Sequence, residues 1–241
     1  MALPTPTHAP RLALLAALTC LSSCTGEGEV EVRVWGEDFI ELGIPADELA
    51  DGWAVEFTRF EVELSEVNVA GVSFDEPATF DLAEASEGRG QLVGRSTTDA
   101  GEFDDGRFVL AEVIVEGQAN KDGVSKQFVW AFPTAVRYSS CDTTTNIEIG
   151  GVGEFQVTVH ADHLFYDSLA SEEPALRFEA LAAADDDGDA DGIVTQAELE
   201  AAGLGAYDPG NLDVANLWAF LVAQAQTMGH VDGEGHCEGS T

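Results

Sequence analysis

Positively charged residues are scarce in this sequence. The chain of 241 residues has 10 Lys and Arg against 45 Asp and Glu, which gives a formal net charge of −35. Such a charge repels phosphate backbones and anionic lipid surfaces, so it excludes nucleic acid as a partner. Apolar residues still make up 45% of the chain, enough to bury a core. Cations are therefore the small partners that the composition favours, unless the acidity serves only solubility.

Sequence signatures of common catalytic sites are also missing. The chain contains no G-x-S-x-G, no H-E-x-x-H and no phosphate-binding P-loop. Carboxylates are numerous, but their pairing into an acid and a base depends on the fold. We therefore expect a non-catalytic protein.

The sequence has no apolar run near its start that is long enough to cross a bilayer. "LALLAALTCL" at residues 12–21 spans ten residues, which suits the apolar part of a signal peptide. "LSSC" at residues 21–24 resembles the lipobox of bacterial lipoproteins, and "ALTC" ending at Cys20 fits that pattern less well. The alternative is an ordinary secretory signal that is cleaved nearby.

The lipobox resemblance implies how the protein is processed and where it resides. Residues 1–23 would be the signal peptide, Cys24 would carry the lipid, and residues 24–29 would be a flexible tether. Thr25 stands where an aspartate would resemble an inner-membrane retention signal. We therefore expect anchoring in the outer membrane of a Gram-negative cell envelope.

Cysteine is sparse, with four residues in the chain. Cys20 leaves with the signal peptide and Cys24 would be lipidated, so Cys141 and Cys237 remain. In an exported protein two such thiols predict a disulfide bond, which would tie the tail to the middle of the chain. A metal thiolate is the alternative.

Alternating apolar and polar residues predict short strands across residues 30–160. The run from Trp53 to Val69 breaks its alternation near Thr58 and Ser65, which indicates bulges or a bend. Asp122-Gly123 is typical of a hairpin turn. About seven strands at regular spacing predict an antiparallel β-sandwich.

Helical spacing replaces the alternation in residues 161–241. We expect a short helix capped by Asp162, a second with Pro174 in its first turn, and a long one capped by Asn211. The fold class is thus mainly β with a C-terminal helical segment. These helices could form a second domain or cover one end of the sandwich.

"DGDADGIVTQAE", residues 187–198, resembles the calcium-binding loop of an EF-hand. The resemblance covers about 35 residues and implies helix–loop–helix geometry around one Ca²⁺. It implies carboxylate ligands from Asp187, Asp189, Asp191 and Glu198, a turn at Gly192, the carbonyl of Ile193, and Thr195 directly or through water. The chain has one such loop and only two methionines, which favours a structural calcium over a calmodulin-like switch.

Four histidines follow residue 159. His160 and His163 could share a metal if the chain between them is helical, with Asp167 one turn further. His230 and His236 could join them if Cys237 ties down the tail, which would make a Zn²⁺ or copper site. The alternative is that these histidines are surface or capping residues.

Two hypotheses for function follow. The first is a lipid-anchored, calcium-binding envelope protein with a structural or adhesive role toward an unknown protein or glycan. The second is an exported transition-metal protein or metal-dependent hydrolase that uses His160 and His163. Metal analysis of the purified protein distinguishes the two.

Overall fold

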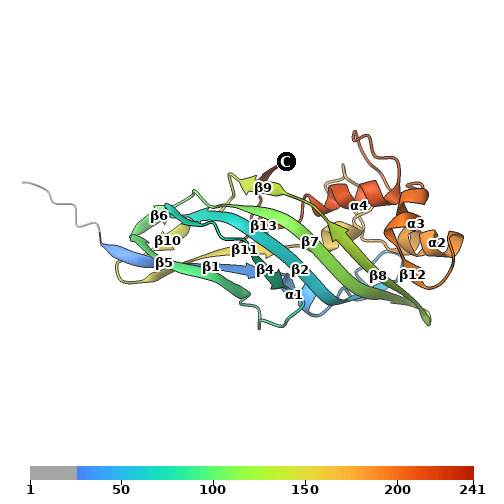
Figure 1. Cartoon of the computed structure of the whole chain (residues 1–241), viewed down its shortest axis with the longest axis horizontal. Helices are drawn as coiled ribbons and strands as arrows, with labels where there is room; N and C mark the ends of the chain where they lie inside the picture. The colour runs from blue at the N-terminus through green and yellow to red at the C-terminus, as the bar shows by residue number, and fades with distance from the viewer. Residues whose placement is uncertain (1–25) are drawn as a thin grey trace, which may run out of the picture.

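The computed structural model describes residues 26–241, so Cys24 and the first residues of the expected tether lie outside the described part. Two main β-sheets pack against each other, and the C-terminal helices gather at the end opposite residue 27, where the first strand begins (Figure 1). The smaller sheet has the order β13-β11-β1-β5. Its strands are β13 (Gly229–Val231), β11 (Val152–Val159), β1 (Glu27–Trp35) and β5 (Gln91–Asp99).

The larger sheet has the order β12-β8-β7-β2-β3, with three further short strands attached to its path. Its main strands are β8 (Val124–Phe132), β7 (Arg107–Lys121), β2 (Ala54–Val69), β3 (Val72–Phe74) and β12 (Ile193–Val194). The attached strands are β4 (Ala78–Asp81), β9 (Val136–Ser139) and β14 (Glu238–Ser240). A separate pair is formed by β6 (Gly101–Phe103) and β10 (Thr145–Ile147).

Both main sheets are mixed, which corrects the expectation of a purely antiparallel sandwich. β1 pairs with β11 in parallel, and so does β12 with β8. The partners β1 and β11 are far apart in sequence, and alternation within a strand carries no information on the direction of its neighbour. The mainly β character is confirmed.

The predicted irregularities of β2 are confirmed. Its register against β7 shifts between Phe57 and Arg59 and again between Ser65 and Asn68, close to the two breaks in alternation. The Asp122-Gly123 turn joins β7 to β8, with φ of 50° and 83°. Both residues thus adopt the left-handed conformation that suits a tight hairpin.

One continuous apolar core lies between the sheets and extends under the helices. Val30, Val32 and Val34 of β1 are fully buried, as are Phe60 of β2 and Phe220 of α4 (Leu217–Ala225). Burying each large apolar side chain contributes about 1.5–3 kcal/mol. The core therefore joins the strand region and the C-terminal segment into one packed unit.

The C-terminal segment is less helical than its spacing predicts, because β12, β13 and β14 also lie in it. Asp162 begins a 3-10 helix, η1 (Asp162–Phe165), whose N-cap is Ala161. The second helix, α2 (Glu179–Asp187), begins after Pro174, and Asn216 rather than Asn211 caps α4. The remaining helices are α1 (Glu37–Glu41) and α3 (Gln196–Ala201).

Long-range polar contacts dock the helices on the larger sheet. α2 has no side-chain cap of its own, and the backbone N–H groups of Phe178 and Glu179 both donate to Asp51 Oδ2 at 2.7 Å. Trp130 Nε1 of β8 donates to the carbonyl of Val194 at 2.9 Å. These contacts fix the loop before α3 against the edge of β8.

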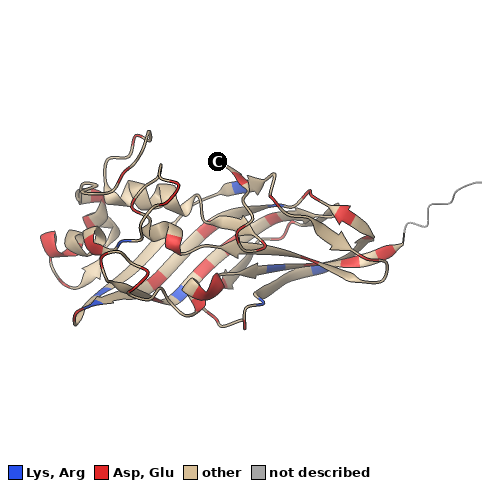
Figure 2. Ribbon diagram, turned by 180° about the vertical axis from the view of Figure 1, so that it is seen from behind, with Lys and Arg blue, Asp and Glu red and all other residues tan. Residues whose placement is uncertain are grey.

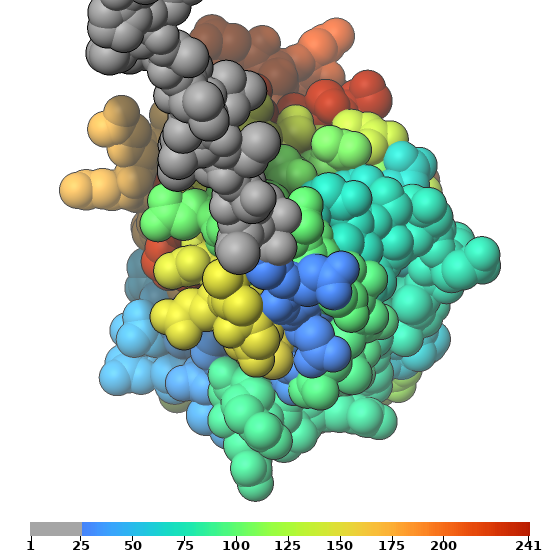
Figure 3. All heavy atoms as spheres, turned by 90° about the vertical axis from the view of Figure 1, so that its left-hand side faces the viewer, coloured from blue at the N-terminus to red at the C-terminus, as the bar shows by residue number. Residues whose placement is uncertain are grey.

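Acidic residues are spread over both sheets and the helical end (Figure 2). At the opposite end, the start of β1 lies beside the turn near residue 150 (Figure 3). Ile149 in that turn is 69% exposed. Among the described residues, no helix is long and apolar enough to cross a membrane.

Candidate metal centre

Two segments of the chain bring four histidines together. His160 follows β11, and His163 lies in η1 immediately after it. His230 lies in β13, which pairs with β11 so that His230 stands opposite Thr158. His236 follows the turn after β13. The pairing of β13 with β11 therefore assembles the group, and we call these four residues the histidine cluster.

The four rings are in contact. The centroid of the His230 ring lies 4.3 Å from that of His160, 5.2 Å from that of His163 and 5.1 Å from that of His236. The rings of His160 and His163 are 5.6 Å apart. His160 and His230 are buried, whereas His236 is exposed. The cluster thus runs from the interior to the surface.

Carboxylates complete two possible ligand sets around His160. One ligand atom each from His160, Asp162 and His163 lie within 4.8 Å of one another, and the same holds for Glu37, His160 and Glu234. Nitrogen and oxygen donors at this spacing can converge on one ion after small side-chain movements. His160 belongs to both sets.

The hydrogen bond of His160 shows which ring nitrogen is available. Nε2 lies 3.1 Å from the carbonyl oxygen of Gly233, which only accepts, so Nε2 carries the proton. Nδ1 then faces Glu37 Oε2 at 3.6 Å and Asp162 Oδ1 at 3.9 Å. A lone pair directed at two carboxylates is repulsive unless a proton or a metal cation lies between them.

A hydrogen bond also fixes which ring nitrogen of His163 carries the proton. Its Nδ1 lies 2.7 Å from Thr227 Oγ1, and that hydroxyl donates its own proton to the carbonyl of Gln224 at 2.8 Å. The hydroxyl therefore accepts from Nδ1–H, which leaves Nε2 of His163 unprotonated. Such a second hydrogen bond fixes the tautomer of many metal-binding histidines.

Two buried polar atoms of this region have no hydrogen-bond partner among the described residues, namely His230 Nδ1 and Asp162 Oδ1. Leaving a buried polar atom unpaired costs about 1–3 kcal/mol. Tyr166 satisfies the other oxygen of Asp162, because its hydroxyl donates to Oδ2 at 2.7 Å. Burial and the charge of Asp162 raise the pKa of Tyr166, so the phenol keeps its proton.

The cluster holds two of its imidazoles in the neutral form. Burial, and then the neighbouring His160 and His236, lower the pKa of His163 to about 3. Burial, and then the other three histidines, lower the pKa of His230 to about 3. Neutral imidazole is the form that binds metals. Burial also raises the pKa of Glu37.

Two hollows adjoin the cluster, and His163, His230 and His236 line both. One of about 360 Å³ also contains His160, Asp162 and Glu234. The other, of about 600 Å³, has a wall of Val136, Tyr138 and Cys237. An ion therefore has an open route to the cluster from solvent.

The predicted histidine set is brought together, but Asp167 lies outside it. Asp167 Oδ2 accepts from Arg177 Nε at 2.7 Å and Oδ1 accepts from the N–H of Ala175 at 3.0 Å. The 3-10 turn at η1 places Asp162 beside His163 instead. Asp162 could have been found as a neighbour in sequence, whereas Glu37 precedes His160 by more than a hundred residues and gives no sequence signal.

The segment in which we expect a calcium loop, residues 187–198, runs from the end of α2 into α3. Asp189 Oδ1 accepts from the N–H of Asp191 at 3.1 Å, and Asp191 Oδ1 accepts from the N–H of Ile193 at 2.8 Å. Thr195 and Glu198 form a reciprocal cap at the start of α3. The N–H of Thr195 donates to Glu198, and this bond is the main cause of the lowered pKa of the Glu198 carboxyl.

The carboxylates that lie together in this loop include two of the four expected ones, Asp189 and Asp191, with Asp185 as the third. Oxygens of Asp185, Asp189 and Asp191 lie within 4.8 Å of one another, whereas Asp187 is exposed at the end of α2. Asp185 is fully buried, and its Oδ1 accepts from the N–H of Gly192 at 3.2 Å. Asp185 thus occupies the interior place that the spacing assigns to Asp187.

A lysine from the sheet neutralises part of this loop. Lys126 of β8 is 5% exposed, and its Nζ pairs with the carboxylates of Asp185 and Asp186. β12 pairs with β8 beside it, through Ile193 and Gln127. The acidic loop is therefore tied to the sheet by an ion pair as well as by backbone hydrogen bonds.

The predicted disulfide between Cys141 and Cys237 is confirmed. It links the segment after β9 to the tail after β13. Disulfides persist in oxidising compartments, so this bond agrees with an exported protein. It rules out the alternative in which these two cysteines bind a metal as thiolates while the bond is intact.

Comparisons with known proteins give little further information. No protein-family model matches the chain, and no curated protein matches it. Among solved structures, a "putative cell adhesion protein" from Bacteroides eggerthii shares 10% identity with a TM-score of 0.18. The match covers 56% of this chain and 46% of that chain. Both values are too low for the description of that protein to bear on this one.

Proposed function

We propose that this protein is an exported metal-binding protein that holds a transition-metal ion, zinc or copper, at the histidine cluster. The observation that carries the proposal is the pair of buried, unpartnered atoms, His230 Nδ1 and Asp162 Oδ1, beside the ligand set of His160, Asp162 and His163. A cation held by this set would satisfy Asp162 Oδ1, and His230, whose ring centroid lies 4.3 Å from that of His160, could join the set after a small side-chain movement. The cation would also remove the repulsion between His160 Nδ1 and its two carboxylate neighbours.

The donor chemistry favours zinc or copper over harder ions. Imidazole nitrogen suits Zn²⁺ and Cu²⁺, whereas Mg²⁺ and Ca²⁺ prefer sites made only of oxygen. The tautomers of His160 and His163 are set by Gly233 and Thr227, so the lone pairs are already oriented. The proposed role is to hold the ion, without catalysis.

The test is metal binding by the purified protein from residue 26 onward. We expect one Zn²⁺ or Cu²⁺ per chain in isothermal titration calorimetry, in buffer with excess Ca²⁺ to cover the acidic surface. Asp162→Asn should weaken this binding about 10–100-fold, as loss of a ligand or its support does elsewhere.

Asp167→Asn is the matched control. It makes the same chemical change five residues away, at a carboxylate that pairs with Arg177 and lies outside the cluster. Its affinity should equal that of the wild type. Equal metal binding by wild type and His163→Gln would contradict the proposal.

A second ion is proposed for the acidic loop, where a structural Ca²⁺ would join α2 to α3. The observation in its favour is the convergence of Asp185, Asp189 and Asp191 between two helices, with Glu198 turned back over the loop. The side chain of Glu198 packs directly against Gly188, where an added Cβ would lie 2.4 Å from Oε1. Extracellular sites of this kind have dissociation constants on the order of 10⁻⁴ to 10⁻³ M.

Thermal melting tests this site. Calcium at a hundredfold excess over its dissociation constant should add about 2.7 kcal/mol to the free energy of unfolding, and Mg²⁺ should add less. Glu198→Gln should remove most of the effect, while Glu200→Gln, outside the loop, should retain it. The same calcium response in both variants would rule out the site.

A further inference from the structure

His236 is the exposed member of the histidine cluster, and its position depends on what holds the tail. On its N-terminal side, Val231 and Gly235 exchange backbone hydrogen bonds of 2.9 Å across the turn after β13. On its C-terminal side, Cys237 is bonded to Cys141. The N–H of Asp142 donates to the carbonyl of His236 at 2.8 Å. His236 is thus fixed between a turn and the disulfide.

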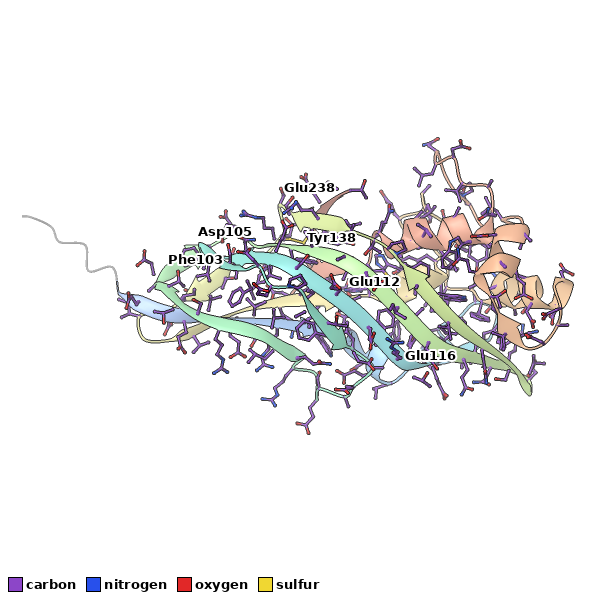
Figure 4. All side chains as sticks on the ribbon, in the orientation of Figure 1. Phe103, Asp105, Glu112, Glu116, Tyr138 and Glu238 are labelled. Atoms are coloured by element: carbon purple, nitrogen blue, oxygen red, sulfur yellow. A yellow bond between two sulfur atoms is a disulfide. The ribbon has the colours of Figure 1, made fainter. Side chains whose placement is uncertain are left out.

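Beyond the disulfide, little else holds the tail. β14 pairs with β9 over three residues, and all three are exposed. Figure 4 shows Glu238 of β14 at the edge of the sheet, beside the strand that carries Tyr138. A three-residue exposed pairing frays readily, since exposed hydrogen bonds contribute little to local stability. The disulfide is therefore the main constraint on His236 from its C-terminal side.

The disulfide is open to attack from one side. Cys237 lines the hollow of about 600 Å³ together with His163, His230 and His236, whereas Cys141 is 7% exposed. A thiolate entering this hollow would approach the disulfide from the Cys237 side. Cys141 would then depart as a thiolate and take up a proton.

We propose that the Cys141–Cys237 disulfide is a redox latch on the histidine cluster, whose reduction releases His236 and weakens metal binding. The proposal rests on the function proposed above. With a dithiol as reductant, its first thiolate forms a mixed disulfide with Cys237 and displaces Cys141. Its second thiol then displaces Cys237, so the dithiol becomes a disulfide and the protein gains two thiols.

The turn at Val231 and Gly235 limits how much reduction of the disulfide can lower the affinity for Zn²⁺. After reduction His236 keeps this turn and the hydrogen bond from the N–H of Asp142 to its carbonyl, so we expect a smaller loss of affinity than His236→Ala causes. We expect His236→Ala to weaken Zn²⁺ binding about tenfold, the lower end of the range for losing a residue that supports a metal site. Reduction should weaken it at least threefold.

A double-mutant cycle tests the latch. Zn²⁺ affinity is measured for the wild type, for Cys141→Ser with Cys237→Ser, for His236→Ala and for the triple variant. The serine pair avoids metal binding by free thiols. If the disulfide acts through His236, the serine pair weakens binding in the wild-type background and has no further effect in the His236→Ala background. Additive losses, or unchanged affinity in the serine pair, would overturn the proposal.

A second measurement uses the oxidised protein and does not require the serine variants to fold. A phosphine, which is itself oxidised to the phosphine oxide with water as oxygen donor, cleaves the disulfide, and alkylation with mass spectrometry counts the released thiols. Saturating Zn²⁺ should slow cleavage at least threefold in the wild type and leave the rate in His236→Ala unchanged. Equal slowing in both would overturn the latch.

The two proposals fail in different ways. If the wild type binds no zinc at the cluster, the proposed function is wrong and the latch falls with it. If zinc binds with the same affinity whether the disulfide is intact or absent, the metal site stands and only the latch is refuted.

Discussion

Acid should destabilise the metal-free protein through the histidine cluster, and His230 allows the magnitude to be worked out. Its pKa is about 3 in the folded protein against 6.5 for a free histidine, chiefly because the ring is buried. Below pH 6.5 the unfolded chain takes up a proton that the folded chain refuses. Stability is therefore complete above pH 6.5 and is lost as the pH falls toward 3.

At pH 5, which lies 1.5 units below the pKa of a free histidine, protonation stabilises the unfolded state by about 2 kcal/mol, at 1.36 kcal/mol per pH unit. This is an upper value for one group, because the four histidines interact and titrate together. Removing His230 should therefore reduce the loss of stability between pH 7 and pH 5 by up to about 2 kcal/mol.

The assay is urea unfolding at pH 7 and pH 5 with a chelator present, followed by tryptophan fluorescence. His230→Gln changes stability at both pH values, but only the difference between them reports the histidine. Tyr138→Phe is the control. It removes hydrogen bonds to Gly229 and Gln226 beside the cluster, but burial raises the pKa of Tyr138 to about 12, so this residue does not titrate between pH 7 and pH 5. Its loss of stability between the two pH values should equal that of the wild type. If His230→Gln loses as much stability between pH 7 and pH 5 as the wild type, the assignment of a neutral, buried His230 is refuted.

Two further predictions concern the acidic loop and the anchor. Lys126→Met should destabilise the calcium-free protein by about 3–5 kcal/mol, because it leaves the buried carboxylate of Asp185 without its partner. The same variant should bind Ca²⁺ more tightly than the wild type in calorimetry, since no ammonium competes for the carboxylates. Cys24→Ala should move the full-length protein from the membrane fraction to the soluble fraction of its host. Unchanged membrane partition would contradict the lipobox interpretation.

The strands of this fold could be predicted from local patterns, but their pairing could not. The two breaks in alternation within β2 coincide with shifts in register because an extra residue changes both the face of a side chain and its partner. The parallel neighbour of β1 is β11, more than a hundred residues later. Long-range pairing depends on the whole core, so the two parallel pairings among the otherwise antiparallel strands could not be predicted.

The helical segment shows how packing overrides spacing. Residues near Pro174 have helical periodicity, yet α2 begins at Glu179, where Asp51 from a distant loop accepts hydrogen bonds from its first N–H groups. A cap supplied by another part of the chain has no signature in the local sequence. The same limit explains why Asp185 could not be recognised as the inner carboxylate, because Lys126 and Gly192 position it.

The histidines themselves were visible in the sequence, but their order along the chain gives no metal motif. Spacing of three residues suggested that His160 and His163 share a helix, whereas a 3-10 turn places them and Asp162 together. The remaining members arrive through β13, a strand of three residues that is too short to show a period. Its register against β11 sets His230 opposite Thr158.

Gly235, in the turn before His236, acts together with the disulfide in placing His236. Gly235 is closely packed, because an added Cβ there would lie 2.5 Å from the carbonyl oxygen of Val231 and 3.1 Å from that of Asp142. Glycine is thus required where the tail passes between β13 and the segment of Cys141. The close approach brings His236 to the cluster, and the disulfide keeps it there. A change at Gly235 should therefore affect metal binding as strongly as loss of the disulfide does.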